Sequence, residues 1–346
     1  MMAQASSNPI QNLLLEKLLF GKNLTVSEIK IFLTAASAKE EIDINFFKSF
    51  LLLLRHKDET SDEIWGMVAF LRAQSKLFNI DLPYLVDNCG TGGDGKGTFN
   101  ISTVSALVAA GAGAHVAKHG NRAASSKVGS SDLLQALGIN ILAAPERMLE
   151  ILRRTGFGYF HAPLYHPVLG KFVRLRREIR GRTIFNLLGP LLNPLSPKRQ
   201  VIGLGRRELL LKMAKTIVRN RPKVAYVICG EGGLDEISPY GKTQGYLITN
   251  TRIRSFLLEP FKYGIKKGSE KDLRGGSLQQ NAQIVKKILL GKIRDSKRDA
   301  VLLNAALTLL ASGRARSFDE GLTLAGNSLD SGRALHVLTK TAELSN

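Results

Sequence analysis

The 346-residue sequence has few cysteines and no long hydrophobic run, and each shortage excludes a class of protein. Two cysteines, Cys89 and Cys229, cannot form a disulfide framework, and we interpret both as small buried hydrophobic residues. No apolar run approaches the roughly 20 residues that a membrane-spanning helix needs. Residues 1–11 also lack the basic and apolar segments of a signal peptide. We therefore expect a cytoplasmic protein without a membrane partner.

Acidic residues are also scarce, since 29 Asp and Glu stand against 49 Lys and Arg for a formal net charge of +20. The excess is concentrated in residues 171–221, where Glu178 and Glu208 are the only acids. Such a charge suits nucleic acid, an anionic membrane surface or a small polyanionic substrate, and a solvated basic face fits equally well. Composition leaves these alternatives open.

Hydrophobic spacing predicts an α/β fold in two parts. Over residues 1–80, apolar residues recur every three or four positions, which predicts a small N-terminal helical bundle domain with Ser27 and Ser61 as N-caps. Over residues 81–346, short β-rich runs such as "AHVAKH" and "KVAYVICG" alternate with helical runs. This alternation is typical of a larger α/β domain with a mostly parallel central sheet flanked by helices. Helices around 165–182 are expected to complete the helical domain.

A glycine-rich stretch, "DNCGTGGDGKGTFNIST" at residues 87–103, predicts a phosphate-binding loop. Gly90 to Lys96 matches the start of a P-loop, but Gly97 follows the lysine where a magnesium-binding hydroxyl is required, and Thr98 comes one residue late. The glycines at 90, 92, 93, 95 and 97 permit positive φ, and "NIST" opens an apolar helix whose first amides point to the same place. We predict a phosphate cradle rather than a P-loop; a functionless glycine-rich hairpin is the structural alternative.

A second polar loop lies within "AKHGNRAASSKVGSSDLLQALG", residues 117–138, and it again connects a predicted strand to a helix. The loop offers cations and hydroxyls from Lys118, His119, Asn121, Arg122, Ser125, Ser126, Lys127, Ser130 and Ser131. An open α/β sheet binds its ligand beyond the carboxyl ends of its strands, where both loops would lie. Their side chains suit a ligand with several phosphate groups.

Two patterns bear on metal binding. His115 and His119 have the spacing of a helical zinc motif, but in a strand residues four apart lie roughly 13 Å from each other, so we do not expect zinc. Asp235 and Glu236 are adjacent acids in a glycine-rich turn after a predicted strand, "EGGLDEIS". This arrangement suits magnesium, which takes one or two carboxylates together with phosphate oxygens and water; a solvated acidic turn is the alternative.

The motifs "GTGGD", "NIST" and "KHGNRAxSSKxGSxDxLxALG" resemble those of the anthranilate phosphoribosyltransferase family. These tryptophan-pathway enzymes join anthranilate to phosphoribosyl pyrophosphate (PRPP). The resemblance continues through "APLYHP", "RTIFNLLGPLLNP", "GLDEIS" and "LLNAALTL", and it covers nearly the whole chain past residue 85. It implies the nucleoside phosphorylase/phosphoribosyltransferase fold, Mg²⁺ as cofactor, and a homodimer formed through the helical domain.

The resemblance also implies site residues. The residues expected to bind PRPP are Gly90, Gly93, Asp94, Thr98, Asn100, Ile101, Ser102, Thr103, Lys118, His119, Gly120, Asn121, Arg122, Ala123, Ala124, Ser125, Ser126 and Ser130. Magnesium is expected at Ser102, Asp235 and Glu236, and anthranilate at Gly90, Asn121 and Arg176. Lys118, His119, Asn121 and Arg176 are expected to position the substrates, with no dedicated acid or base.

The implied chemistry fits the absence of a catalytic base, because the aromatic amine of anthranilate is neutral at pH 7 and needs no strong base. Holding the two substrates in line and stabilising the departing pyrophosphate would carry the reaction. The sequence departs from the family pattern in "REIRGRT", which moves a glycine and inserts Arg180 near Arg176, and also at Val128 and His161. Two alternatives remain: a non-catalytic paralogue that binds nucleic acid through a basic groove, and a pyrimidine-nucleoside phosphorylase on the related fold.

Overall fold

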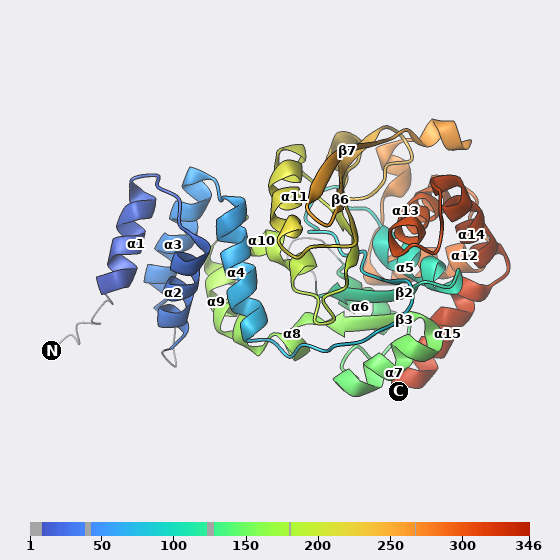
Figure 1. Ribbon diagram of the computed structural model, residues 1–346. Helices are drawn as coiled ribbons and strands as arrows, with labels where there is room; N and C mark the ends of the chain where they lie inside the picture. The colour runs from blue at the N-terminus through green and yellow to red at the C-terminus, as the bar shows by residue number, and fades with distance from the viewer. Residues whose placement is uncertain (1–8, 39–42, 123–127, 180, 267) are drawn as a thin grey trace.

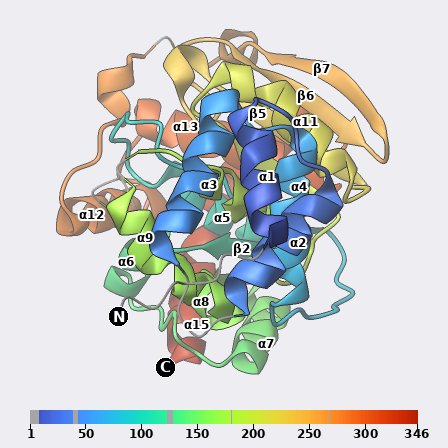
Figure 2. The ribbon, with the colours of Figure 1, turned by 90° about the vertical axis from the view of Figure 1, so that its left-hand side faces the viewer.

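The computed structural model describes residues 9–38, 43–122, 128–179, 181–266 and 268–346. Its N-terminal part consists of helices α1 (Pro9–Leu19), α2 (Val26–Ser37), α3 (Ile44–Lys57) and α4 (Ser61–Ala73). Figures 1 and 2 show these four helices side by side at one end of the molecule. The predicted N-caps at Ser27 and Ser61 are wrong. Thr25 and Thr60 cap α2 and α4, because each forms a reciprocal capping box with the glutamate three residues later.

The remaining chain forms an α/β structure, as the sequence predicts. Strands β1 (Leu85–Val86), β2 (His115–Gly120) and β3 (Phe157–His161) make a parallel sheet in that order. Strands β4 (Arg199–Gly203), β5 (Val224–Cys229), β6 (Thr243–Thr249) and β7 (Arg252–Leu258) make a second sheet. In it only β4 and β5 are parallel, and β6 and β7 form an antiparallel hairpin. A parallel bridge between Asp87 and Gln200 joins the two sheets.

Helices cover both sheets. They are α5 (Ile101–Gly111), α6 (Ser130–Ala136), α7 (Pro145–Thr155), α8 (Ala162–Tyr165), α9 (Val173–Glu178), α10 (Phe185–Leu188), α11 (Leu210–Val218), α12 (Leu278–Leu289), α13 (Ser296–Ser312), α14 (Phe318–Asp330) and α15 (Arg333–Ser345). Short 3₁₀ turns occur at Pro167–Phe172, Gly189–Leu191, Arg207–Leu209, Glu231–Gly233, Pro260–Tyr263 and Glu270–Leu273. Among the helices so described, none is long and apolar enough to cross a membrane.

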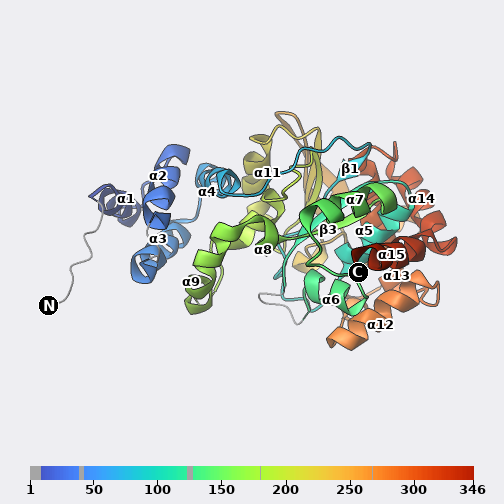
Figure 3. The same ribbon diagram turned by 90° about the horizontal axis from the view of Figure 1, so that it is seen from below.

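Two large hydrophobic clusters hold these elements together. The first packs α5 against α13, α14 and α15 and against one side of the sheets. The close approach depends on small residues, since a Cβ on Gly111 would lie 2.4 Å from Ser328 Oγ. The second cluster joins α1–α4 to residues 172–192, to α11 and to part of the second sheet. Figure 3 shows α8 and α9 between the N-terminal helices and the α/β body.

Candidate active site

The loops that follow β1, β4 and β5 meet at one edge of the joined sheets. Thr91 N donates to Gly203 O at 2.9 Å, which fixes the glycine-rich loop against the end of β4. Ser102 N, at the start of α5, donates to Glu236 Oε1 at 3.0 Å. Because β1, β4 and β5 run parallel, their carboxyl ends lie at the same edge. The glycine-rich loop and the acid pair, which are far apart in the sequence, are therefore neighbours.

The glycines of the first loop adopt the predicted backbone. Gly92, Gly93, Gly95 and Gly97 have φ between 63° and 78°, a region that side chains other than glycine rarely adopt. Gly90 serves a different purpose, because a Cβ there would lie 3.1 Å from Gly203 O. Within this loop, Lys96 forms an ion pair with Glu270 at 2.8 Å. The ammonium group of Lys96, the lysine of the P-loop-like stretch, is therefore already paired with a carboxylate.

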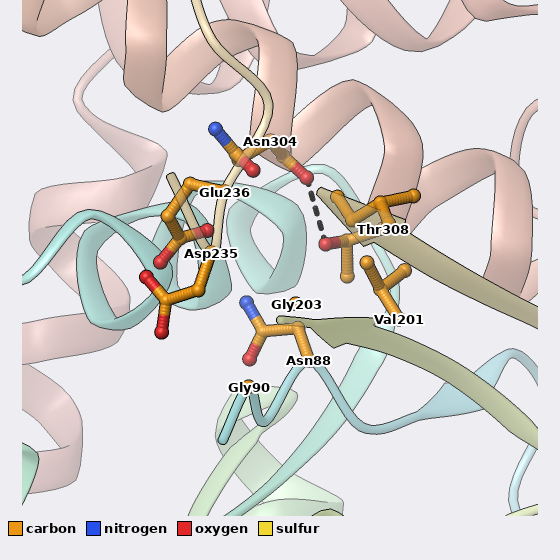
Figure 4. Close-up of a pocket in the computed structure, with 9 residues that line it drawn as sticks. Asn88, Gly90, Val201, Gly203, Asp235, Glu236, Asn304 and Thr308 are labelled. Atoms are coloured by element: carbon orange, nitrogen blue, oxygen red, sulfur yellow. Dashed lines mark hydrogen bonds between the residues drawn. The ribbon is translucent and has the colours of Figure 1, made fainter. Parts of the chain in front are cut away.

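The carboxylates of Asp94, Asp235 and Glu236 converge beside this loop. Asp94 Oδ2 lies 3.5 Å from Asp235 N, and Figure 4 shows the side chains of Asp235 and Glu236 next to each other at a small pocket. Desolvation, reinforced by the nearby charge of Asp94, raises the pKa of Asp235 well above its usual value. Desolvation raises the pKa of Glu236 to about 7, although Lys118 and Ser102 favour its charged form.

This acid pair fits a divalent cation. The raised pKa values show that nearby cations do not fully stabilise the two carboxylates in their charged form. A hard divalent cation, which binds oxygen ligands, would stabilise that form. No three His, Cys, Asp or Glu side chains in the described ranges are arranged to hold a metal by themselves. Magnesium needs only one or two protein carboxylates, because it usually keeps several waters and takes its other oxygen ligands from substrate phosphates.

Two glycines that the sequence analysis did not select make room for the acid pair. A Cβ on Gly203, the last residue of β4, would lie 1.6 Å from Asp235 O, so no other residue fits the observed backbone there. A Cβ on Gly205 would lie 2.9 Å from both the Cα and the Cβ of Asp94. The sequence signal was the G-x-G spacing at the end of "QVIGLG", a run that itself predicts a strand. That signal is weak without knowledge of which loops meet.

Lys118, near the end of β2, connects the second loop to the first. Its side chain is buried, and Nζ donates to the backbone O and the Oδ1 of Asn88, each at 3.3 Å. Asn88 Nδ2 in turn donates to Ser102 O at 2.8 Å. The charge of Lys118 also lowers the pKa of Glu236 against the effect of desolvation. A single buried cation thus lies within reach of the glycine-rich loop, α5 and the acid pair.

His119 is buried next to the ring of His166. Its Nδ1 contacts Gly189 O at 2.9 Å, while Nε2 is buried and has no hydrogen-bond partner among the described residues. Its ring lies 5.2 Å from that of His166, and burial lowers the pKa of His119 to about 3. His119 is therefore neutral near pH 7. His115 points elsewhere and contacts Pro83 O at 2.8 Å, as expected for residues four apart in a strand.

The second loop is described only in part. A Cβ on Gly120 would lie 2.6 Å from Tyr159 Oη, which explains the glycine. Asn121 is exposed, and Arg122 contacts Asp132 and Gln135 of α6 at 2.7 and 2.8 Å. Ala123, Ala124, Ser125 and Ser126 lie outside the described residues. Ser130 begins α6 at the far end of the loop.

The remaining predicted residues lie at the start of α5, in the loop before it and on α9. Asn100 Nδ2 donates to Val128 O at 3.1 Å and so joins the two loops. Ile101 and Thr103 are buried, whereas Ser102 is half-buried, and Thr98 pairs with Arg274. Arg176 lies on α9, but its side chain is outside the described part of the structure. Later in the same motif Gly181 has φ of 130°, so the displaced glycine of "REIRGRT" occupies a position that requires glycine.

Comparisons with known proteins find similar sequences and similar folds over almost the whole chain. The glycosyl transferase family model (a/b domain) matches residues 82–335. An anthranilate phosphoribosyltransferase of Bacillus cereus (strain B4264) is 43% identical over 96% of this chain and 97% of its own length. The crystal structure of the Thermus thermophilus enzyme of that name is 36% identical, with a TM-score of 0.88 over 96% of this chain and 98% of that one. A Saccharomyces cerevisiae enzyme in complex with PRPP and Mg is 29% identical, with a TM-score of 0.89 over 98% of both chains.

Proposed function

We propose where and how this chain, which belongs to the anthranilate phosphoribosyltransferase family, joins its two substrates. The enzyme transfers the phosphoribosyl group of PRPP to the amine of anthranilate, in tryptophan biosynthesis, and releases pyrophosphate. The observation that supports the proposed site best is the hydrogen bond from Ser102 N to Glu236 Oε1, because it brings the phosphate loop and the acid pair together. The relatives' names favour this enzyme over a nucleic-acid-binding paralogue and over a phosphorylase.

PRPP is proposed to bind across the two loops. Backbone N–H groups at Gly93 to Gly97, together with the first turn of α5, suit the diphosphate, since successive amides with positive φ form an anion site. Lys118 supplies positive charge beside them. The residues proposed to contact PRPP are those expected from the sequence, namely Gly90, Gly93, Asp94, Thr98, Asn100, Ile101, Ser102 and Thr103 in the first loop, and Lys118 to Ser126 with Ser130 in the second.

Magnesium is proposed to bind at Asp235, Glu236 and the hydroxyl of Ser102, with Asp94 close by. A Saccharomyces cerevisiae relative has been solved with PRPP and Mg, which supports Mg²⁺ as the cation. When bound, the ion would stabilise negative charge on the departing pyrophosphate. The acid pair itself holds the cation in place and adds no proton transfer to the reaction.

Anthranilate is proposed to bind near Gly90, Asn121 and Arg176, with His119 beside its ring. A neutral His119 beside the ring of His166, whose pKa is also lowered by burial, suits an aromatic substrate. An arginine fork would take the carboxylate through two parallel hydrogen bonds. Catalysis then depends on alignment, in which the amine attacks the anomeric carbon from the face opposite the pyrophosphate. Positioning of this kind can lower a barrier by roughly 7–11 kcal/mol.

The test is PRPP-dependent loss of anthranilate fluorescence with and without Mg²⁺. Asp235→Ala is expected to lower kcat at saturating anthranilate by about 100-fold or more, because charge on the leaving group is no longer stabilised. Asp299→Ala is the matched control, since Asp299 is another half-buried aspartate whose pKa is raised by burial, on α13. Near-normal activity of Asp235→Ala at limiting Mg²⁺ would refute the proposed role.

Two further proposals concern the whole enzyme. A homodimer through the helical domain is supported by large apolar side chains that α1 leaves exposed, including Leu13, which is 58% exposed. The proposed location is the cytoplasm. Cys229 is buried and Cys89 half-buried, and both are free thiols, which suits a reducing compartment.

A further inference from the structure

We propose that Asn304 is a positioning residue that holds the Asp235–Glu236 turn in the conformation needed for magnesium and PRPP. The inference rests on the proposed function, because it gives that turn its purpose. Asn304 lies in the middle of α13, on an element that contributes no predicted site residue. It lines the same pocket as Asp235 and Glu236 (Figure 4).

The side-chain amide of Asn304 is buried and uses its hydrogen-bonding groups on the backbone. Oδ1 accepts from Ile237 N at 2.8 Å, and Nδ2 donates to Ile237 O at 3.1 Å. The second hydrogen of Nδ2 is donated to Ala300 O, one turn earlier in α13, at 2.8 Å. The amide therefore pairs with both backbone groups of Ile237, as a neighbouring strand would, and Ile237 directly follows Glu236.

Among the described residues, Ile237 lies in no strand or helix, so no sheet or helix hydrogen bonds fix its backbone, and the next anchor is the hydrogen bond from Ser238 N to Thr243 Oγ1 at 3.1 Å. On the near side, Gly230 N donates to Leu234 O at 2.7 Å, which closes the turn before Asp235. On the far side, the pair of bonds to Asn304 replaces a strand partner for Ile237. Asp235 and Glu236 lie between these two fixed points. Their like charges would push the carboxylates apart if the backbone were free to move.

Asparagine is the residue type that this geometry requires. A carboxamide carries an acceptor and a two-hydrogen donor side by side, and both are needed to pair with one residue's N–H and C=O. Aspartate would lose the donors and add another negative charge to the site. Leucine has a similar size but would leave the buried N–H and C=O of Ile237 unpaired.

The experiment compares Asn304→Leu and Asn304→Thr with the wild-type enzyme. Threonine can keep the local bond to Ala300 O, as Thr308 does with Asn304 O, so it removes only the clamp on Ile237. We expect both variants to raise the KM for PRPP and the Mg²⁺ concentration for half-maximal rate by about 10-fold or more. The KM for anthranilate should stay within about twofold, because the turn does not contact that substrate.

Ser312→Ala is the control for lost buried hydrogen bonds in α13. Ser312 lies about 12 Å further along the helix axis than Asn304. Its hydroxyl donates to Leu309 O and accepts from Arg314 N, neither of which is a predicted site residue. Wild-type PRPP and Mg²⁺ dependence in both Asn304 variants would overturn the inference, as would failure of both to fold. If Asp235→Ala is inactive while the Asn304 variants are normal, only this inference fails; if Asp235→Ala is also normal, the proposed function fails with it.

Discussion

At the scale of single residues, the site depends on close backbone contacts as much as on charged groups. Gly203 is the sharpest case, because a Cβ would lie 1.6 Å from a backbone oxygen of the turn that carries the acid pair. No side-chain rotation can relieve that overlap. The acid pair can occupy its position only if β4 ends in glycine.

Gly203→Ala is therefore expected to displace Asp235 and to lower PRPP turnover by about 100-fold, with a lower Tm. Gly326→Ala is the matched control. Gly326 lies in α14 without a positive φ, and the added Cβ would meet no described atom within 4 Å outside the nearby backbone of its own helix, so alanine should stabilise that helix by roughly 0.5–1 kcal/mol. The measurements are the PRPP turnover and the Tm of both variants. Near-normal turnover by Gly203→Ala would contradict the requirement for glycine at the end of β4.

The sequence predicted the charged and phosphate-binding residues of the site better than the residues that matter through close packing. Gly92, Gly93, Asp235 and Glu236 stand in motifs whose composition already suggests a phosphate loop and a cation site. Gly203 had only the weak G-x-G signal, and Asn304 stands in "LLNAALTL", a motif that supported the resemblance without giving Asn304 a role. The importance of both residues comes from the approach of β4 and α13 to one turn. The binding roles of all these residues stay predictions.

At the scale of elements, patterns of spacing predict which segments are helical better than where helices begin. Ser61 precedes an apolar run and is the expected cap of α4, but Thr60 has the extended backbone of an N-cap. Thr60 Oγ1 accepts from Glu63 N at 3.2 Å, and Glu63 Oε2 accepts from Thr60 N at 2.8 Å. A reciprocal box requires a serine or threonine three residues before the glutamate, and Ser61 is only two residues before Glu63.

Thr60→Ala should therefore lower the free energy of unfolding by about 1 kcal/mol. Ser61→Ala should change it by less than about 0.5 kcal/mol, because Ser61 is an ordinary first-turn residue. Urea unfolding of the two variants distinguishes the caps. A larger loss for Ser61→Ala would show that the helix begins one residue later than described.

The second sheet shows what spacing alone could not predict. The stretch "RIRSFLL" carries no strand prediction, yet it forms β7 beside β6. Only Asn250 and Thr251 connect the two strands, and so short a connection permits antiparallel pairing alone. Its position at the edge of the sheet explains the exposed arginines at 252 and 254, since charged edges resist pairing with other chains.

At the scale of the whole molecule, the large positive charge no longer argues for nucleic acid, because full-length relatives are named as anthranilate phosphoribosyltransferases. Part of that positive charge would attract the polyanionic substrate PRPP. The hydrophobic cluster that joins α1–α4 to residues 172–192 supports the expected completion of the helical domain, although the domain boundaries themselves stay a prediction.

The proposed dimer is tested at this scale. Leu13 and Phe20 of the N-terminal segment are 58% and 69% exposed, and acidic residues there should separate the subunits. We expect light scattering to give a dimer for the wild-type protein and a monomer for Leu13→Glu/Phe20→Glu. Leu142→Glu, at a position 57% exposed in the α/β part, should remain dimeric. A wild-type monomer would exclude the proposal.

The most direct measurement is a crystal structure of the enzyme with PRPP and Mg²⁺. The central claim is that the glycine-rich loop, the Lys118 loop and the acid pair bind one molecule of PRPP together. The predicted result is a diphosphate on the amides of Gly93 to Gly97 and α5, with its metal bound by Asp235 and Glu236. A diphosphate that contacts only one loop, or a metal bound away from both acids, would contradict the claim.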